Sequence, residues 1–222
     1  MRGCTPHKVL ALALVTLVTS FGVFGLPAMG NAAPTVEQYR LRGPAAYGAL
    51  YAYDDCSYTD FYVNANAYWE KNAPGAPTSN NAVYASFYQS RYCGDTWSYA
   101  YGSGFVSDAA QLDPKLEAGS ASVSFDVYVY ECGFDGEDYN CTETVVPFTG
   151  TMNWTGVGAT SREKSSYSYK TPSAMYRSRY SGSSRGAEVS GSATLDGVSL
   201  NFSESYGSLM SISSGTMSVS RY

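Results

Sequence analysis

The stretch from Ala121 to Gly158 constrains the fold more than any other part of this sequence. Apolar and polar residues alternate on both sides of a short acidic segment. An alternation of period two places the apolar side chains on one face of a β-strand. These apolar positions are Val123, Phe125, Val127 and Val129 in the first half and Val146, Phe148, Gly150, Met152 and Trp154 in the second. The pattern predicts one long β-hairpin with its tip between Cys132 and Cys141.

Further strand-like stretches follow one another along the rest of the chain. About ten strands are expected, separated by turn residues and with almost no helical periodicity. This arrangement is typical of a single antiparallel β-sandwich, with a barrel as the alternative. We therefore expect one secreted β-sandwich domain over residues 45–222, preceded by an N-terminal arm at 34–44. A domain of roughly 190 residues is long enough to bury a substantial core.

Clusters of glycine, serine and proline mark the expected turns. We expect turns at residues 159–165, 181–184 and 206–207, and a loop with at most one helical turn at 107–119. The Asp196-Gly197 pair is typical of a tight hairpin turn. Ser213-Ser-Gly215 predicts a β-bulge.

The N-terminal residues 1–33 are typical of a secretory signal peptide. Arg2 and Lys8 precede an apolar run from Val9 to Leu26, and small residues follow it. The alternative is an uncleaved anchor, because the run approaches the ~18–20 residues that span a bilayer. The small residues favour cleavage, and hence a secreted protein, either extracellular or periplasmic. No second long apolar stretch occurs, so we expect no membrane span in the mature form.

Cysteine usage agrees with export. Outside the leader the chain holds four cysteines, and an even number in a secreted protein indicates two disulfides with three possible pairings. If the cysteines lie at the tips of successive hairpins, those tips meet at one end of the sheet. The predicted pairs are Cys56–Cys93 and Cys132–Cys141.

Acidic residues gather in the same predicted turns. Calcium binds carboxylate and carbonyl oxygens on such loops. The candidate calcium ligands are Asp54, Asp55, Asp95, Asp135, Glu137 and Asp138. The spacing of an EF-hand is absent, and the simpler interpretation is that these acids are ordinary turn residues.

Tyrosine is unusually frequent, with 21 residues in the chain. Many occupy alternate positions beside serine, so they share one face of a strand. A phenol ring is apolar and carries a polar tip, which suits stacking on sugar rings or packing on another protein. The candidate ligand-binding residues are Tyr99, Tyr101, Tyr128, Tyr130, Tyr167 and Tyr169. The simpler interpretation is that tyrosine covers an exposed sheet through cross-strand pairs.

Residue types exclude most enzymes. The only histidine, His7, lies in the leader, so the mature chain lacks a Ser-His-Asp or Cys-His catalyst and any histidine-ligated metal. A carboxylate pair hydrolysing a glycoside remains the exception. Asp126 and Glu131 fall on opposite faces of one strand, which does not suit a common cleft.

The charge balance bears on partners. The formal net charge is −5, and the arginines are dispersed along the sequence. Nucleic-acid binding requires clustered positive charge, so we expect no nucleic-acid partner. We also expect no cofactor apart from the calcium considered above.

The alternating strands, the cysteine-bearing turns and the run Asn153-Trp-Thr-Gly-Val-Gly158 followed by Arg162 resemble uncharacterised secreted bacterial proteins of mostly β structure. That resemblance implies no activity. The sequence thus predicts a non-catalytic secreted binding module for carbohydrate or a cell-surface ligand, such as another extracellular protein, using tyrosine-rich sheet faces. The alternative is a calcium-stabilised structural or adhesin-like domain.

Overall fold

The structure is a computed structural model that describes residues 35–71, 79–107, 109–134 and 136–221. The predicted signal peptide therefore lies outside the described residues. The ten strands are β1 (Thr35–Tyr53), β2 (Ser57–Lys71), β3 (Ser79–Cys93), β4 (Thr96–Ser107), β5 (Ala110–Leu112), β6 (Ala118–Phe134), β7 (Tyr139–Lys170), β8 (Ala174–Leu195), β9 (Val198–Leu200) and β10 (Glu204–Arg221).

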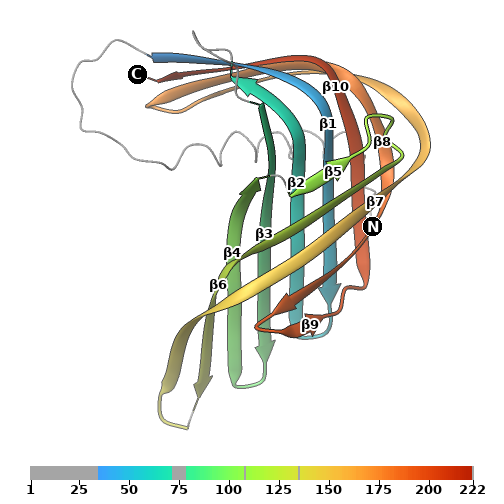
Figure 1. The fold of residues 1–222 in the computed structure, drawn as a ribbon. Coiled ribbons are helices and arrows are strands. Elements are labelled where there is room, and N and C mark those ends of the chain that lie inside the picture. The colour runs from blue at the N-terminus through green and yellow to red at the C-terminus, as the bar shows by residue number, and fades with distance from the viewer. Residues whose placement is uncertain (1–34, 72–78, 108, 135, 222) are drawn as a thin grey trace.

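All ten strands belong to one antiparallel sheet, which confirms the predicted all-β class (Figure 1). The order runs β10-β1-β2-β3-β4-β6-β7-β8-β9, while β5 pairs with β6. β10 pairs with β1 on one side and with β8 on the other, so the eight long strands form a closed ring. In Figure 1, β6 and β7 pass in front of the layer formed by β1 to β4. Two parts of one sheet thus face each other, as in the predicted sandwich.

One hydrophobic core fills the space between these parts. Phe148 of β7 is fully buried, and its ring centroid lies 4.8 Å from that of Phe87 and 5.1 Å from that of Phe61. Phe61 and Phe87 belong to β2 and β3, so these contacts join opposite sides of the ring. Burying a side chain of this size contributes roughly 1.5–3 kcal/mol. The largest fully buried side chains are Trp154, Phe61, Phe87, Phe148, Met152 and Leu209.

The predicted central hairpin is confirmed. β6 and β7 pair from Ala118↔Thr155 to Phe134↔Tyr139, and Phe125 lies opposite Phe148. The apolar residues of both strands face the core, as the alternation predicted. Trp154 is buried, and its indole N–H donates to the carbonyl oxygen of Tyr47 at 2.8 Å, which satisfies its one polar atom.

Three predicted turns are wrong. Residues 159–165 belong to β7, residues 181–184 to β8, and residues 206–207 to β10. These serine-rich segments remain strands because the neighbouring strands pair with their backbone and hydroxyl groups bond across the ladder. Ser161 and Ser184 do so at 2.9 Å. The chain turns instead between β7 and β8, at residues 171–173.

The N-terminal arm and the 107–119 segment also differ from the sequence expectation, whereas a predicted turn and a predicted bulge agree with it. Residues 35–44 of the expected arm are strand, paired with β10. The 107–119 segment contains the short β5 and a turn in which Leu116 has a φ of 62°. Positive φ angles at both residues confirm the tight turn at Asp196-Gly197. A shift in register between Ile212 and Ser214 confirms the bulge. The proline and glycine residues between Lys71 and Asn81 are typical of a loop between hairpins. Residues 72–78 lie outside the described residues, and residues 79–81 already belong to β3.

Within the described ranges, no helix is long and apolar enough to cross a membrane.

Candidate ligand-binding face

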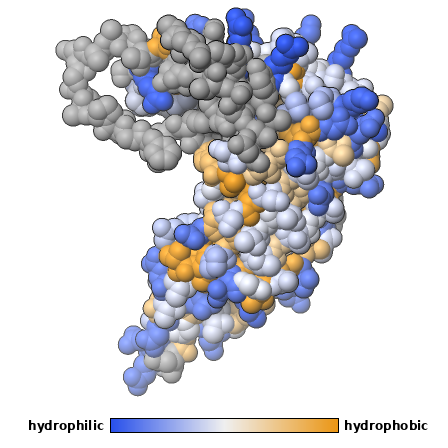
Figure 2. Space-filling view, viewed as in Figure 1, coloured by the Kyte–Doolittle hydropathy of each residue, from blue (hydrophilic) through white to orange (hydrophobic). Residues whose placement is uncertain are grey.

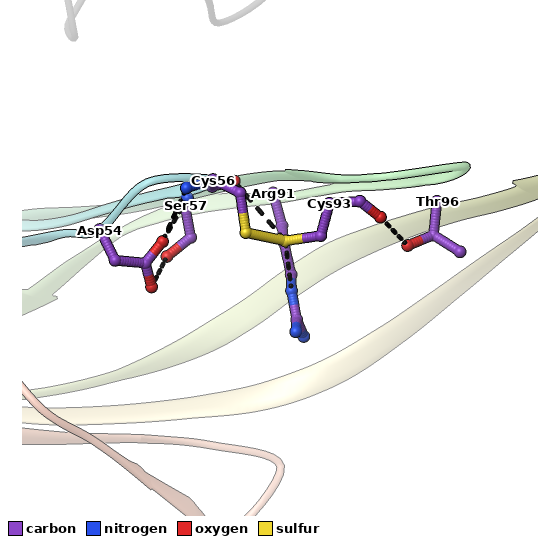
Figure 3. Close-up of a disulfide and its surroundings, with 6 residues drawn as sticks. All are labelled: Asp54, Cys56, Ser57, Arg91, Cys93 and Thr96. Carbon is purple, nitrogen blue, oxygen red and sulfur yellow. Dashed lines mark hydrogen bonds between the residues drawn. A yellow bond between two sulfur atoms is a disulfide. The ribbon is translucent and has the colours of Figure 1, made fainter.

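Both predicted disulfides are present at one end of the sheet. Cys56–Cys93 joins the β1–β2 turn to the end of β3 and is called the inter-hairpin disulfide below. Cys132–Cys141 joins directly opposed residues of β6 and β7 and is called the hairpin disulfide. Figure 3 shows the first of these, with Arg91 beside the Cys93 sulfur and Thr96 on the Cys93 carbonyl. Disulfides are typical of proteins that fold in an oxidising compartment.

Asp54 has a structural role in the turn next to this disulfide. Its carboxylate accepts hydrogen bonds from the backbone N–H of Cys56 at 2.9 Å and of Ser57 at 2.7 Å, and from the Ser57 hydroxyl (Figure 3). These bonds, with the Cys56 amide first, lower the pKa of Asp54 below its usual value. This is the behaviour of a side chain that closes a turn.

The predicted calcium ligands do not assemble within the described chain. Asp55, Asp95, Glu137 and Asp138 are exposed on three different turns. Among residues 35–71, 79–107, 109–134 and 136–221, no group of three or more acidic, histidine or cysteine side chains is arranged to hold a metal ion. Asp135 lies outside those residues, so calcium binding stays a prediction.

Aromatic side chains cover the outer face of β2, β3, β4 and β6. We call this surface the tyrosine face; its members are Tyr58, Tyr88, Tyr92, Trp97, Tyr99, Tyr101, Tyr128 and Tyr130. It arises because cross-strand partners have the same orientation on the sheet. In one row Asp60 pairs with Tyr88, Tyr88 with Tyr101, and Tyr101 with Tyr128.

A second row runs parallel to the first. Tyr58, Ser90, Tyr99 and Tyr130 are its successive cross-strand partners. With strands about 4.8 Å apart, each four-strand row extends over roughly 15 Å. The tyrosine face is therefore a two-dimensional array and not a single stripe.

The rings of this array contact one another. The Tyr99 centroid lies 5.1 Å from that of Tyr130 and 5.9 Å from that of Tyr101, and Tyr101 lies 5.7 Å from Tyr128. In these three pairs the ring planes differ by 30° or less. Trp97 extends the array, at 5.8 Å from Tyr99. Each such contact contributes about 0.5–1.5 kcal/mol beyond burial, so the rings hold one another in place.

Four of the predicted ligand-binding tyrosines are thus brought together, and two are not. Tyr99, Tyr101, Tyr128 and Tyr130 lie in the array. Tyr167 and Tyr169 form a separate stacked pair on β7, beside Tyr176 of β8. The array remains accessible, since 49% of Tyr101 and 46% of Tyr128 is exposed to solvent.

Asp60 adds a carboxylate to the array. The Tyr58 hydroxyl donates to its Oδ2 at 3.1 Å. Burial raises the pKa of Asp60, against the opposing effect of this hydrogen bond. Burial and the neighbouring carboxylate raise the pKa of Tyr58 to about 12. The array therefore combines apolar ring surfaces with hydroxyl donors and a carboxylate acceptor.

A second group of tyrosines, Tyr47 and Tyr51 of β1 and Tyr206 of β10, borders the array. The Tyr47 and Tyr206 hydroxyls are hydrogen-bonded to each other. The Tyr51 and Tyr206 rings stack at 5.6 Å. Burial, followed by hydrogen bonding to Tyr206, raises the pKa of both Tyr47 and Tyr51. Tyr47 is buried beneath this surface, whereas 39% of Tyr206 is exposed.

Sequence reasoning missed Tyr58, Tyr88 and Tyr92 as members of this face, and it missed Asp60 beside them. Tyr58 and Asp60 are two residues apart, so their shared orientation was readable from strand parity. The pairing of β2 with β3 and of β3 with β4 that places them beside Tyr101 was not. No protein-family model matches this chain, and no curated protein matches it significantly. The resemblance to secreted bacterial β-proteins therefore stays a prediction.

Proposed function

We propose that this protein is a secreted, non-catalytic binding module whose tyrosine face binds carbohydrate. The observation that carries the proposal is the array of partly exposed rings centred on Tyr101 and Tyr128, with Asp60 in the same row. Soluble monomers rarely expose extended aromatic surfaces, and such surfaces mark interaction sites.

Carbohydrate suits the chemistry of this face. Sugar rings present apolar C–H faces that stack on aromatic side chains, and their hydroxyls need polar partners. Tyrosine hydroxyls donate and accept hydrogen bonds, and the Asp60 carboxylate accepts them. Because the array is spread over four strands, it suits several sugar units of an extended chain.

The proposal includes an extracellular or periplasmic location for the mature protein. A cleaved signal peptide would deliver the chain across a membrane, and the two disulfides fit an oxidising extracellular or periplasmic environment. The absence of histidine after residue 7 and of a free cysteine in the mature chain supports binding without catalysis.

The experiment is a glycan-array screen of the purified mature protein, followed by titration of the best glycan. Replacing Tyr101 and Tyr128 together with alanine is expected to weaken binding by at least about tenfold, since truncating a central aromatic contact typically costs 2 kcal/mol or more. The matched control replaces Tyr167 and Tyr169, which form a stacked pair outside the array. Thermal melts check that each variant is folded.

Two results would contradict the proposal. One is that no glycan binds the wild-type protein. The other is that both double variants lose binding equally. Melts of the wild type with calcium and with EDTA, in the same series, test the calcium prediction, because a bound ion raises the melting temperature.

A further inference from the structure

A second surface, on different strands, is positively charged, although the chain as a whole is negatively charged. Five cations converge on the outer face of β1, β7, β8 and β10: Arg40, Arg42, Lys164, Arg177 and Arg179. They line two adjoining hollows of about 560 and 520 Å³ that share Arg40, Arg179 and Thr216. We call this surface the basic groove. Figure 2 shows strongly hydrophilic side chains projecting from the upper part of the molecule, where these strands lie in Figure 1.

The register of the sheet explains the convergence. Arg40, Thr216 and Arg179 are successive cross-strand partners on β1, β10 and β8. Gln38, Ser218 and Arg177 form the next row. Arg177 and Arg179 are two residues apart on one strand, so their Cα atoms lie about 7 Å apart. The groove thus presents guanidinium groups in a regular array with hydroxyl groups between them.

Few acids lie beside these cations in the sheet. Of the cross-strand partners that the register gives them, Glu70 of β2, opposite Arg40, is acidic, and the others are serine or threonine. The nearest acid on β7, Glu163, points to the opposite side of its strand from Lys164 and accepts a hydrogen bond from Ser184. Five positive charges beside the one acidic partner, Glu70, in a chain of net charge −5, create a field that attracts anions to this place.

We propose that the basic groove binds an acidic polysaccharide through its carboxylate or sulfate groups. Guanidinium groups bind such oxyanions in a bidentate manner, and the interspersed serine and threonine hydroxyls can bond sugar hydroxyls. Two adjoining hollows exceed what a single small anion needs. A nucleic-acid strand is less well matched, because the aromatic side chain lining the groove, Tyr180, is buried and offers no ring for base stacking.

The test uses three fluorescent probes of equal length with the mature protein: a sulfated or uronate oligosaccharide, a neutral oligosaccharide and a DNA strand. The acidic oligosaccharide is expected to bind with an affinity that falls steadily with salt, as polyanion contacts require. Arg177→Ala with Arg179→Ala is expected to weaken that binding by at least about tenfold, since hydrogen bonds to charged groups are the strong ones.

The matched control is Arg91→Ala with Lys115→Ala, which removes the same charge from exposed positions outside the groove. Equal binding of acidic and neutral probes would overturn the proposal, as would equal losses in the two double variants or tighter binding of DNA. Because this groove shares no residue with the tyrosine face, the Tyr101 and Tyr128 variants should bind the acidic probe normally. Failure of either proposal is therefore distinguishable from failure of the other.

Discussion

Phe148→Ala is the substitution that tests the core most directly. Phe148 is fully buried, and its ring contacts those of Phe61, Phe87 and Phe125 at centroid distances of 5.1, 4.8 and 4.8 Å. Replacing a buried phenylalanine with alanine costs about 3–5 kcal/mol. Three lost aromatic contacts place this site in the upper half of that range, at about 4–5 kcal/mol. That is a large part of the 5–15 kcal/mol that stabilises a typical domain.

The assay is equilibrium unfolding in urea with both disulfides intact, followed by circular dichroism. The midpoint should fall while the slope with denaturant stays constant, because the surface exposed on unfolding changes little. The control is Phe134→Ala, since Phe134 is 44% exposed and has one ring contact, with Tyr139. It should lose less than about 1 kcal/mol. A loss at Phe148 no larger than this control would refute the packing of β7 against β2 and β3.

Three further predictions concern the disulfides, the buried phenols and one glycine. Replacing both cysteines of one disulfide with serine should lower the free energy of unfolding by about 3.8 kcal/mol for the inter-hairpin disulfide and by about 2.6 kcal/mol for the hairpin disulfide. The difference arises because the two disulfides span sequence separations of 37 and 9. Equal losses in urea titrations of the two variants would count against this prediction. The raised pKa values of Tyr47 and Tyr51 mean that the stability they contribute is fully present below the unfolded value of about 10 and is lost as the pH rises further. A titration followed by phenolate absorbance should therefore show Tyr47 and Tyr51 ionising only as the protein unfolds. Ionisation of all tyrosines in the folded protein near pH 10 would contradict this prediction. Gly150→Ala should cost about 1–3 kcal/mol because its Cβ would meet the Phe61 ring, whereas Gly133→Ala, with its nearest neighbour at 4.0 Å, should melt like the wild type.

The central hairpin and the disulfide pairs could be predicted from short stretches of the sequence. The β6–β7 hairpin followed from strict alternation around a short acidic tip, since strand periodicity and a tight connection are both encoded within a few residues. Cysteine pairing followed from the same hairpins, because a tip brings its cysteines to one end of the sheet. Arg177 and Arg179 lie on the opposite face of β8 from Tyr176 and Tyr180, as the parity of a strand alone indicates.

The same reasoning failed for segments whose composition is typical of a turn but whose backbone pairs with neighbouring strands. Residues 159–165 and 181–184 are rich in serine and charge, which resembles a turn, yet they lie inside β7 and β8. Their strand conformation depends on partners elsewhere in the chain, such as Ser214 of β10, which bonds Ser181 at 2.9 Å. Propensity is a weak guide when neighbouring strands satisfy the backbone.

By itself, the sequence determined the all-β class, the central hairpin, the disulfide pairs and which face of each strand a tyrosine or arginine occupies. Only the tertiary structure decided which strands are neighbours. The arginines are dispersed along the sequence, yet closure of the ring through β10 places Arg40 two strands from Arg179, although 139 positions of sequence separate them. Parity is a property of one strand and can be read residue by residue. Register between distant strands is set by the packing of the whole core, so the tyrosine face and the basic groove exist only once the sheet has closed.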